Sequence, residues 1–445
     1  MKKQTIVLIL IFHLISFLAF TQEKPSPLTE AERTEVVDSI SSILDNNYVY
    51  PDVATKMVNH INTKLKDGAY KTIEDPIEFS QLLTSDLQEI SKDLHLRVMF
   101  RPEQIDRWRN ASQSTEDSIA MAERRLKANR RSNYGFQEVK ILEGNVGYLN
   151  LSGFFNVDEE AGETAQAAMN YLSNSDALII DLRQNGGGSP SMIQLISSYL
   201  FGPESVHLNS FYYRPTDEHT QTWTLPYVPG KRRPDIPVYV LTSNRTFSAA
   251  EEFSYNLRNL ERATLVGEVT GGGAHPGGTR IATDRYMIWA PTGRAINPIT
   301  NTNWEGTGVQ PHMEVPAADA LTKAHVDALE TIKKSRDEDD QFSIQWAIDG
   351  LNAKGTNVTV DASTLKSYAG NYGPRKLTYE NGTLYYQREG NAKHPLIPMN
   401  DHMFMIEEIP YFRIKIMKEG GIASAILGMY DDGRTDTSVR TSSMP

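Results

Sequence analysis

The chain has 445 residues, of which 39% are hydrophobic and 23% are charged, and its formal net charge is −11. This length predicts two or three domains, each large enough to bury a core. The acidic balance argues against nucleic acids and anionic membrane surfaces as partners, because both require basic patches. The absence of cysteine excludes disulfides and a thiol nucleophile.

Residues 1–22 have the pattern of a secretory signal peptide. Lys2 and Lys3 precede the apolar run TIVLILIFHLISFLAF, and small residues stand near its end at Ala19 and Thr21. We expect this segment to be cleaved on export to the periplasm or the extracellular space, with an uncleaved anchor as the alternative. No other stretch is apolar enough to span a bilayer, so no membrane association is expected after cleavage.

Residues 27–100 are predicted to form an N-terminal helical domain. Thr29 and Glu32 make a capping box, and apolar residues at helical spacing follow. Asp75 and Pro76 mark the start of a further helix. Residues 101–135 are polar and rich in arginine, which favours a solvated helical connection; a lid over a neighbouring cleft is the alternative.

Residues 136–316 are predicted to form the α/β core. Short β-branched runs alternate with helical stretches: VGYLNL, ALIIDLR, PVYVLTS and ATLVGE are expected strands. This alternation predicts βαβ units on a mostly parallel sheet. Ligands bind at the carboxyl ends of the strands in such sheets, where DLRQNGGG, TSNRTFSAAEE and GEVTGGGAHPGG fall.

The remaining residues are expected to be a helical linker and a small accessory domain. Residues 317–360 are charged and helical in pattern, whereas residues 361–445 consist of short strands at hairpin spacing. RKLTYENGTLYYQR predicts a hairpin with Asn381 and Gly382 at its turn. The pattern indicates an antiparallel β barrel or sandwich without a catalytic signature.

Ser248 is the first candidate for chemistry, because it follows a predicted strand and begins a predicted helix. The partial positive charge and free N–H groups of a helix N-terminus favour a developing oxyanion. The simpler interpretation is an N-cap, a position where serine is among the preferred residues. The three glycines from Gly186 to Gly188 add a turn whose amides can face a bound group.

A serine nucleophile needs a base. His95 in DLHLRV and His275 in GGGAHPGG are both candidates, and Glu305 or Glu268 could orient an imidazole. The residues themselves do not choose among these. No cluster of cysteines and histidines indicates a metal, and the triple glycine lacks the lysine and hydroxyl of a phosphate-binding loop, so neither a metal nor another cofactor is expected.

Five motifs in order, DLHLRV, ALIIDLRQNGGG, TSNRTFSAAEE, GEVTGGGAHPGG and EGTGVQPHMEV, resemble the tail-specific, or C-terminal processing, serine peptidases. The branch of the tricorn core protease and interphotoreceptor retinoid-binding protein is the most similar. The resemblance covers residues 30–316 and implies a crotonase-like (ClpP-like) core. Only about forty residues separate DLHLRV from YGFQEV, which leaves no room for the PDZ domain of the processing peptidases.

The resemblance also implies site residues. It makes Ser248 the nucleophile, His95 the base and Glu305 its orienting acid, with oxyanion donors at Gly187, Gly188 and Ala249. No lysine lies between Lys231 and Lys323, so the serine–lysine dyad of the processing peptidases cannot form. Where the tricorn-like branch has a serine beside the histidine, this chain has Leu94.

The sequence therefore predicts an exported serine endopeptidase that hydrolyses peptides or unfolded proteins through an acyl-enzyme. The alternative is a non-catalytic protein that binds hydrophobic ligands or peptides on the same fold. An esterase or amidase would use the same serine, although the GxSxG elbow of α/β-hydrolases is absent around Ser248. The sequence leaves the oligomeric state open.

Overall fold

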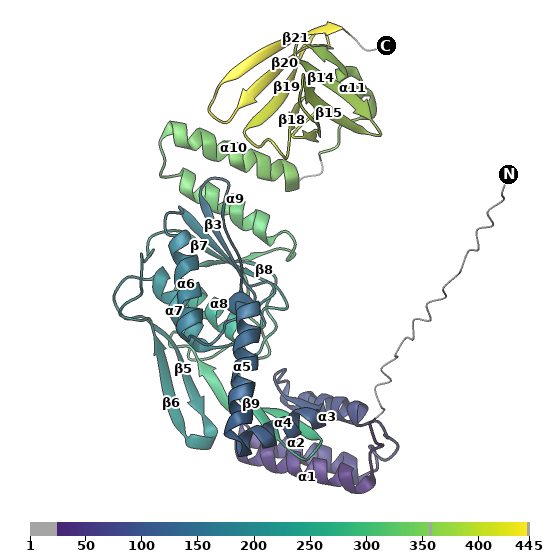
Figure 1. Ribbon diagram of the computed structural model, residues 1–445, viewed down its shortest axis with the longest axis vertical. Helices are drawn as coiled ribbons and strands as arrows, with labels where there is room; N and C mark the ends of the chain where they lie inside the picture. Colours follow the sequence, from purple (N-terminus) through teal and green to yellow (C-terminus); the bar gives the residue numbers. More distant parts are fainter. Residues whose placement is uncertain (1–24, 356–357, 443–445) are drawn as a thin grey trace, which may run out of the picture.

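The computed structural model describes residues 25–355 and 358–442, which form a mixed α/β structure (Figure 1). The expected signal peptide, residues 1–22, lies outside the described residues. None of the helices described combines the length and apolarity that a membrane span requires. In Figure 1, N-terminal helices lie at one end, a six-stranded sheet with its helices in the middle, and antiparallel strands at the other end.

The N-terminal helices are α1 (Glu30–Asn47), α2 (Pro51–Lys66) and α3 (Pro76–Ser91). Their starts follow from capping chemistry: Thr29 Oγ1 accepts the Glu32 N–H at 3.2 Å, and Asp75 Oδ1 accepts the Ile77 N–H at 2.7 Å. Their apolar faces form one core, which also includes Tyr286 and Ile288 from much later in the chain.

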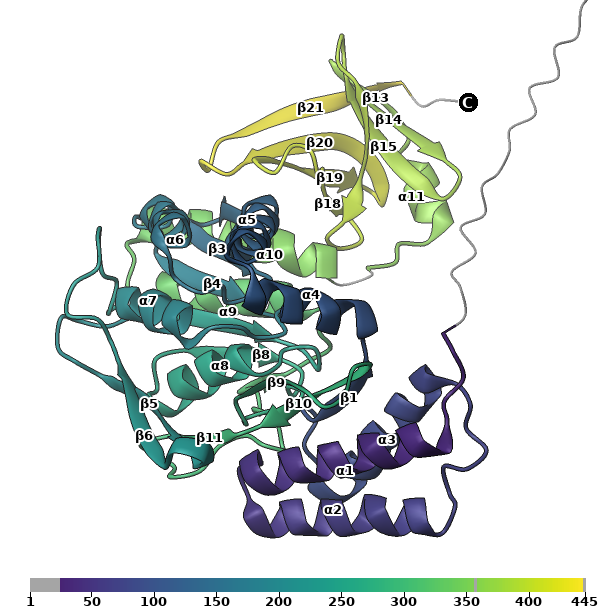
Figure 2. The same ribbon diagram turned by 60° about the horizontal axis from the view of Figure 1, so that its bottom comes forward.

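A three-stranded antiparallel sheet joins these helices to the central part of the chain (Figure 2). It contains β1 (Arg97–Phe100), β10 (Tyr286–Pro291) and β9 (Gly277–Ile281), in that order. Arg97 pairs with Trp289, and Phe100 pairs with Tyr286. The polar stretch after β1 forms α4 (Pro102–Gln113) and α5 (Thr115–Arg131), as the helical pattern predicts.

The central sheet has the strand order β12-β8-β7-β4-β3-β2, and its strands from β3 to β12 run parallel. The antiparallel β2 closes one edge. The four expected strands are present as VGYLNL, ALIID, VYVLT and TLVG, and the last three are shorter than expected. The bounds are β2 (Phe136–Leu142), β3 (Val146–Leu151), β4 (Ala177–Asp181), β7 (Val238–Thr242), β8 (Thr264–Gly267) and β12 (Met313–Glu314).

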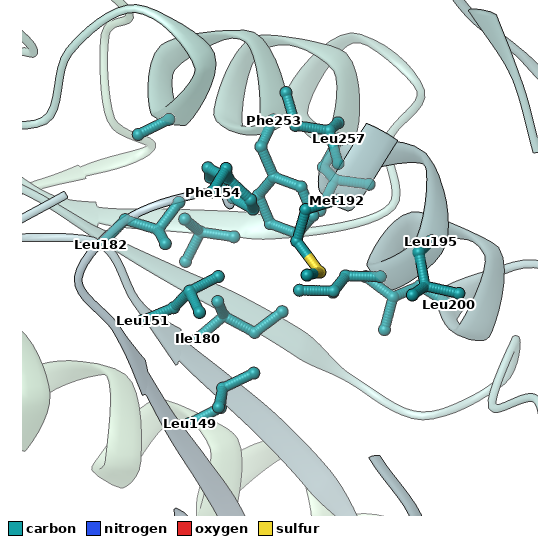
Figure 3. Close-up of a cluster of buried hydrophobic side chains, with 14 of the residues drawn as sticks. Leu149, Leu151, Phe154, Ile180, Leu182, Met192, Leu195, Leu200, Phe253 and Leu257 are labelled. Atoms are coloured by element: carbon teal, nitrogen blue, oxygen red, sulfur yellow. The ribbon is translucent and has the colours of Figure 1, made fainter. Parts of the chain in front are cut away.

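Helices cover both faces of this sheet. Successive residues of a strand point to opposite faces, so each buried strand contributes side chains to two cores. Leu178 and Ile180 pack with α6 (Glu159–Tyr171), α7 (Pro190–Leu200) and α8 (Ala249–Asn259), in the cluster of Figure 3. Ala177 and Ile179 pack instead with α9 (Ala320–Lys333) and α10 (Glu338–Gly355). The sheet is therefore packed between two layers of helices, with its carboxyl-end loops at one edge.

A second small antiparallel sheet was not predicted. It consists of β11 (Gly293–Ile296), β5 (His207–Tyr213) and β6 (Glu218–Trp223), in that order. The short helical turns η1 (Asn133–Gly135) and η2 (Arg214–Thr216) lie before β2 and between β5 and β6. The alternation of strands and helices in the sequence therefore accounted for the parallel sheet but missed two antiparallel additions.

The C-terminal residues form α11 (Ala362–Tyr368) and a nine-stranded antiparallel sheet that curves into a near-barrel. The predicted hairpin is present, with Asn381 and Gly382 at φ 49° and 89° in its turn. The strands are β13 (Gly370–Tyr372), β14 (Arg375–Glu380), β15 (Thr383–Arg388), β16 (Lys393–Pro395), β17 (Ile397–Pro398), β18 (Met403–Met405), β19 (Phe412–Glu419), β20 (Ile422–Tyr430) and β21 (Thr435–Ser442).

Candidate functional site

Ser248 occupies a strained turn between β7 and α8. Its backbone angles are φ 54° and ψ −120°, and the Ala250 N–H donates to the Phe247 carbonyl at 3.1 Å. Ser248 is thus the first central residue of a turn with the angles of type II′, a position that usually requires glycine. A serine at positive φ carries strain, and such strain is concentrated at functional sites.

The carboxylate of Glu251 holds this turn against the glycine-rich loop that follows β8. It accepts the Ser248 N–H at 2.8 Å, the Gly272 N–H at 2.6 Å and the Gly273 N–H at 2.8 Å. The Thr270 hydroxyl donates to it at 2.5 Å. Four donors on one buried carboxylate fix the position of Ser248 relative to the loop and satisfy that carboxylate's charge.

The triple glycine after β4 lies against the same turn. Gly187 and Gly188 have φ values of 107° and 138°, which an L side chain rarely adopts. A Cβ atom on Gly187 would lie 2.9 Å from the Ala249 nitrogen, so any side chain there would crowd the start of α8. The Gly187 N–H already donates to Asn185 Oδ1 at 2.9 Å, which leaves Gly188 and Ala249 as the candidate oxyanion donors.

His95 comes from the segment between α3 and β1, and its ring packs against Phe247, with 4.5 Å between ring centroids. Its backbone N–H donates to Asp93 Oδ1 at 3.0 Å. The side chain is 10% exposed, and Nδ1 has no hydrogen-bond partner among the residues described. Burial lowers the pKa of His95, although Asp93 opposes that shift, so the imidazole is neutral at pH 7 and able to accept a proton.

Next to His95 lies a cluster of charged side chains that contains two further candidates, His275 and Glu305. His275 Nδ1 lies 2.7 Å from Asp93 Oδ2 and 3.4 Å from Glu305 Oε2. The Tyr48 hydroxyl donates to Asp93 at 3.2 Å, and the Ala274 N–H donates to Glu305 at 2.6 Å. Asp93 therefore contacts the His95 backbone and the His275 ring at once.

Glu305 has an unusual charge state in this cluster. Burial and the nearby Asp93 raise its pKa to about 7, and His275 counteracts part of that shift. Its Oε1 is buried without a hydrogen-bond partner in the described part of the chain. Glu305 thus exchanges a proton near neutral pH, close to two imidazoles.

Glu268, the other acid proposed from the sequence, has a different environment. It accepts the Ala317 N–H at 3.0 Å and the Asn244 N–H at 3.2 Å. These backbone hydrogen bonds lower its pKa. Glu268 therefore joins two loops at the end of the central sheet, and nothing in its contacts brings it to an imidazole.

A cleft of about 700 Å³ brings the central candidates together. Ser248, His95, Gly188 and Ala249 all line it, although His95 and Ser248 are 153 positions apart in the sequence. Its walls are largely apolar and aromatic, and they include Leu94, Phe211, Tyr213, Trp289 and Trp304. Gly187, His275, Glu268 and Glu305 are not among the lining residues.

Two of the lining or supporting groups were missed by the sequence analysis. Asp93 stands two residues before His95, and an acid at that spacing was the available signal. Glu252 also lines the cleft, but nothing in the sequence distinguishes it from its neighbour Glu251. Burial in the folded protein is what distinguishes these two acids from other acidic residues, and the local sequence does not specify burial.

Two groups of side chains in the described residues could supply metal ligands. Asp93, His95 and Glu305 each offer an atom, and these atoms lie within 4.8 Å of one another. His60, Asp86 and Glu89 form a similar set, but Lys64 and Tyr70 already bond to Asp86 at 2.6 and 2.7 Å. That no metal is needed remains a prediction.

The fold and cleft together define an α/β protein with a serine at a strained strand-to-helix turn and a neutral histidine in the same cleft. Comparison with known families makes this class specific. Residues 145–315 match peptidase family S41, and residues 28–132 match the N-terminal domain of Peptidase_S41 in eukaryotic IRBP. The chain belongs to peptidase family S41, the family of the C-terminal processing serine peptidases.

The chain is also similar to solved structures of proteases. A putative peptidase from Parabacteroides merdae ATCC 43184 is 18% identical, with a TM-score of 0.46 over 66% of this chain and 96% of that one. The photosystem II D1 C-terminal processing protease is 14% identical, with a TM-score of 0.40 over 65% and 94%. The tricorn protease is 15% identical, with a TM-score of 0.39 over 72% and 37%.

Proposed function

We propose that this protein is a serine endopeptidase that cleaves peptides or unfolded proteins through an acyl-enzyme on Ser248. One observation carries the proposal: a serine at φ 54° shares its cleft with a histidine whose side chain is only 10% exposed. Membership of family S41 supports a peptidase, and a peptide or protein is the substrate class of that family.

The proposed reaction begins with attack on the substrate carbonyl. His95 takes the hydroxyl proton of Ser248 as the oxygen bonds to the carbonyl carbon, and the N–H groups of Gly188 and Ala249 stabilise the oxyanion. The C–N bond then breaks, and the departing amine receives the proton from His95. Water attacks the ester in turn and gives a proton to His95. The bond between the carbonyl carbon and Ser248 Oγ then breaks, Oγ takes that proton back, and the carboxylic acid product leaves.

In this proposal the acids behind His95 support the positive charge that it acquires. Glu305 would act as the orienting acid implied by the family resemblance, and Asp93 as a second acid that the sequence analysis did not name. Asp93 Oδ1 lies 3.9 Å from His95 Nδ1. A carboxylate oxygen of Glu305 lies within 4.8 Å of both side chains. An imidazolium is stabilised by carboxylates at such separations.

The fold and location carry further proposals. We take the central sheet with its helices as a crotonase-like core, with the limits 27–100, 101–135, 136–316, 317–360 and 361–445 for the parts of the chain. We also propose export, on the basic and apolar pattern of residues 1–22. Fractionation of the native host, with the mature N-terminus sequenced, tests both export and cleavage.

A fluorophosphonate probe tests the function directly, because it labels activated serines. The expected result is labelling of one peptide, the one that contains Ser248, together with hydrolysis of a casein-type substrate. The Ser248→Ala protein should show neither. Full turnover by that variant would disprove the assignment of the nucleophile.

A second function has its own supporting observation. The cleft walls carry Phe211, Tyr213, Trp289 and Trp304, which suit a hydrophobic ligand as well as a peptide. Leu94, 49% exposed, stands where the tricorn-like branch has a serine. A binding protein would co-purify with lipophilic molecules in native mass spectrometry and leave the fluorophosphonate unreacted.

A further inference from the structure

Glu252 lies one helical turn beyond Ser248 and faces the same cleft. Its backbone N–H donates to the Ser248 carbonyl at 2.9 Å, and its side chain is among the lining groups. One turn of an α-helix advances about 5.4 Å, so the Glu252 backbone is one turn from Ser248, within the span of a bound substrate side chain. The residue as a whole is only 3% exposed.

The Glu252 carboxyl is incompletely satisfied, unlike that of its neighbour. Glu251 accepts four hydrogen bonds, whereas Glu252 Oε1 has no hydrogen-bond partner in the described structure. Burial raises the pKa of Glu252 to about 7, and the side chains of Asn209 and Asn256 counteract the shift. A buried acid without a partner is costly to a fold and is a group that a ligand can satisfy.

Two asparagines that do not line the cleft lie next to Glu252. Asn209 and Asn256 are fully buried, and the Asn256 amide nitrogen has no partner within the described residues. The same holds for both polar atoms of the Asn209 side chain. These asparagines therefore hold the carboxyl from the protein side, and Glu252 is the one of the three that lines the cleft, where a substrate group can satisfy it.

Several of the residues that line the cleft together with Glu252 are apolar or aromatic. Phe211, Tyr213, Trp304 and Pro190 line the cleft together with Glu252. Glu252 contributes to raising the pKa of the Tyr213 hydroxyl, which places that ring near the carboxyl. Aromatic walls that end in an acid suit a side chain with a long hydrocarbon stem and a cationic head.

We propose that Glu252, held from behind by Asn209 and Asn256, forms the floor of a specificity subsite for a lysine or arginine at the residue whose carbonyl Ser248 attacks. The stem lies along Phe211, Tyr213 and Trp304, and the cation pairs with ionised Glu252. This inference rests on the proposed peptidase function. It adds a preference for basic residues that neither the family match nor the cleft alone defines.

The first test compares two peptides that differ at one residue, lysine against norleucine, which keeps the four-carbon stem without the charge. The protein should cleave the lysine peptide with a kcat/KM at least about 30-fold higher, the scale on which buried charge pairs act. Glu252→Gln should remove most of this ratio by lowering the lysine value alone. Glu163→Gln, an exposed residue on α6, is the matched control and should keep the ratio.

A preference for norleucine, or an equal loss on both peptides in the Glu252 variant, would overturn the subsite. Binding separates this failure from failure of the peptidase proposal. The Ser248→Ala protein should bind the lysine peptide at least about tenfold more tightly than the norleucine peptide by calorimetry, and equal affinities would count against the subsite. Absence of fluorophosphonate labelling, with this binding difference intact, would instead reject the catalytic proposal alone.

Discussion

The ring of His95 lies 4.5 Å from the ring of Phe247, the residue directly before Ser248. The histidine is therefore positioned next to the serine turn by packing, while Asp93 holds its backbone N–H. Packing of this kind is sensitive to small changes of shape at the contact. Several expected outcomes follow from it and from the charges behind it.

Replacing Ser248 by glycine and by alanine should separate catalysis from strain. Both variants should lose hydrolysis, because both lack the hydroxyl. Ser248→Gly should be more stable than Ser248→Ala by about 1 kcal/mol, since glycine tolerates the φ of 54° that costs an L residue energy. Chemical denaturation of both variants measures the difference, and equal stabilities would mean that the turn is unstrained.

Gly273→Ala should disturb His95. A Cβ atom there would overlap the Phe247 ring and lie 2.7 Å from His95 Cε1. A displacement of about 1 Å in a catalytic group can cost roughly 100-fold in rate, so we expect a loss of that order in kcat. Gly278→Ala is the control, because a Cβ atom on Gly278 meets no atom within 4 Å. Similar activity in the two variants would refute the role of this contact.

The pH dependence should report Glu305. Burial and Asp93 raise the pKa of Glu305 to about 7, while burial lowers the pKa of His95. Ionised Glu305 supports the imidazolium, so kcat/KM should rise as the pH increases through about 7. Glu305→Gln should lower the maximum and remove this step. A wild-type profile that is flat from pH 6 to pH 8 would contradict the prediction.

Asp93→Asn should shift that profile in a defined direction. Asp93 raises the pKa of both Glu305 and His95, so its neutralisation should move the acid limb of kcat/KM to lower pH. We also expect kcat to fall about 100-fold with a smaller change in KM, because the imidazolium loses a nearby charge. A purely structural role would lower activity at every pH without moving the limb.

Glu252 should make stability depend on pH. Burial raises its pKa from the ordinary 4.5 to about 7, so between these pH values the folded state holds a proton that the unfolded state has lost. Stability conferred by this group is therefore lost as the pH rises from about 5 to 8. The stability advantage of Glu252→Gln over wild type should be larger at pH 8 than at pH 5, by about 3 kcal/mol. Urea unfolding of both proteins at each pH measures it.

Much of the fold could be predicted because its signals are local. The strand ALIID is continuously apolar, as a strand covered on both faces must be, and Asn381-Gly382 specifies its own turn. The β5–β6 hairpin lacked such a signal: HLNSFYY and EHTQTW carry neither a strong apolar alternation nor a two-residue glycine turn. Its pairing with β11 is set by tertiary contacts.

The site was predictable where residue type and position carried the chemistry. Ser248 was a candidate from its place at a strand-to-helix junction, and the family resemblance favoured His95 over His275; the fold brings Ser248 and His95 to one cleft. Asp93 and Glu252 were not, because an aspartate or glutamate becomes unusual only through burial and missing partners. The hydrogen bond from the Gly187 N–H to Asn185 Oδ1 could not be predicted either, because it depends on the conformation of the glycine turn.

The antiparallel pairing of β1 with β10 connects the N-terminal part of the chain to the cleft, because His95 precedes β1 and lines the cleft. His95 stands two residues before β1, so the register of Arg97 against Trp289 helps to set the position of the imidazole in the cleft. A fragment beginning at residue 136 would keep the serine and lose the histidine. Two separately expressed halves would have to re-form this strand pair, together with the core that β10 shares with the N-terminal helices, before both residues could line one cleft again.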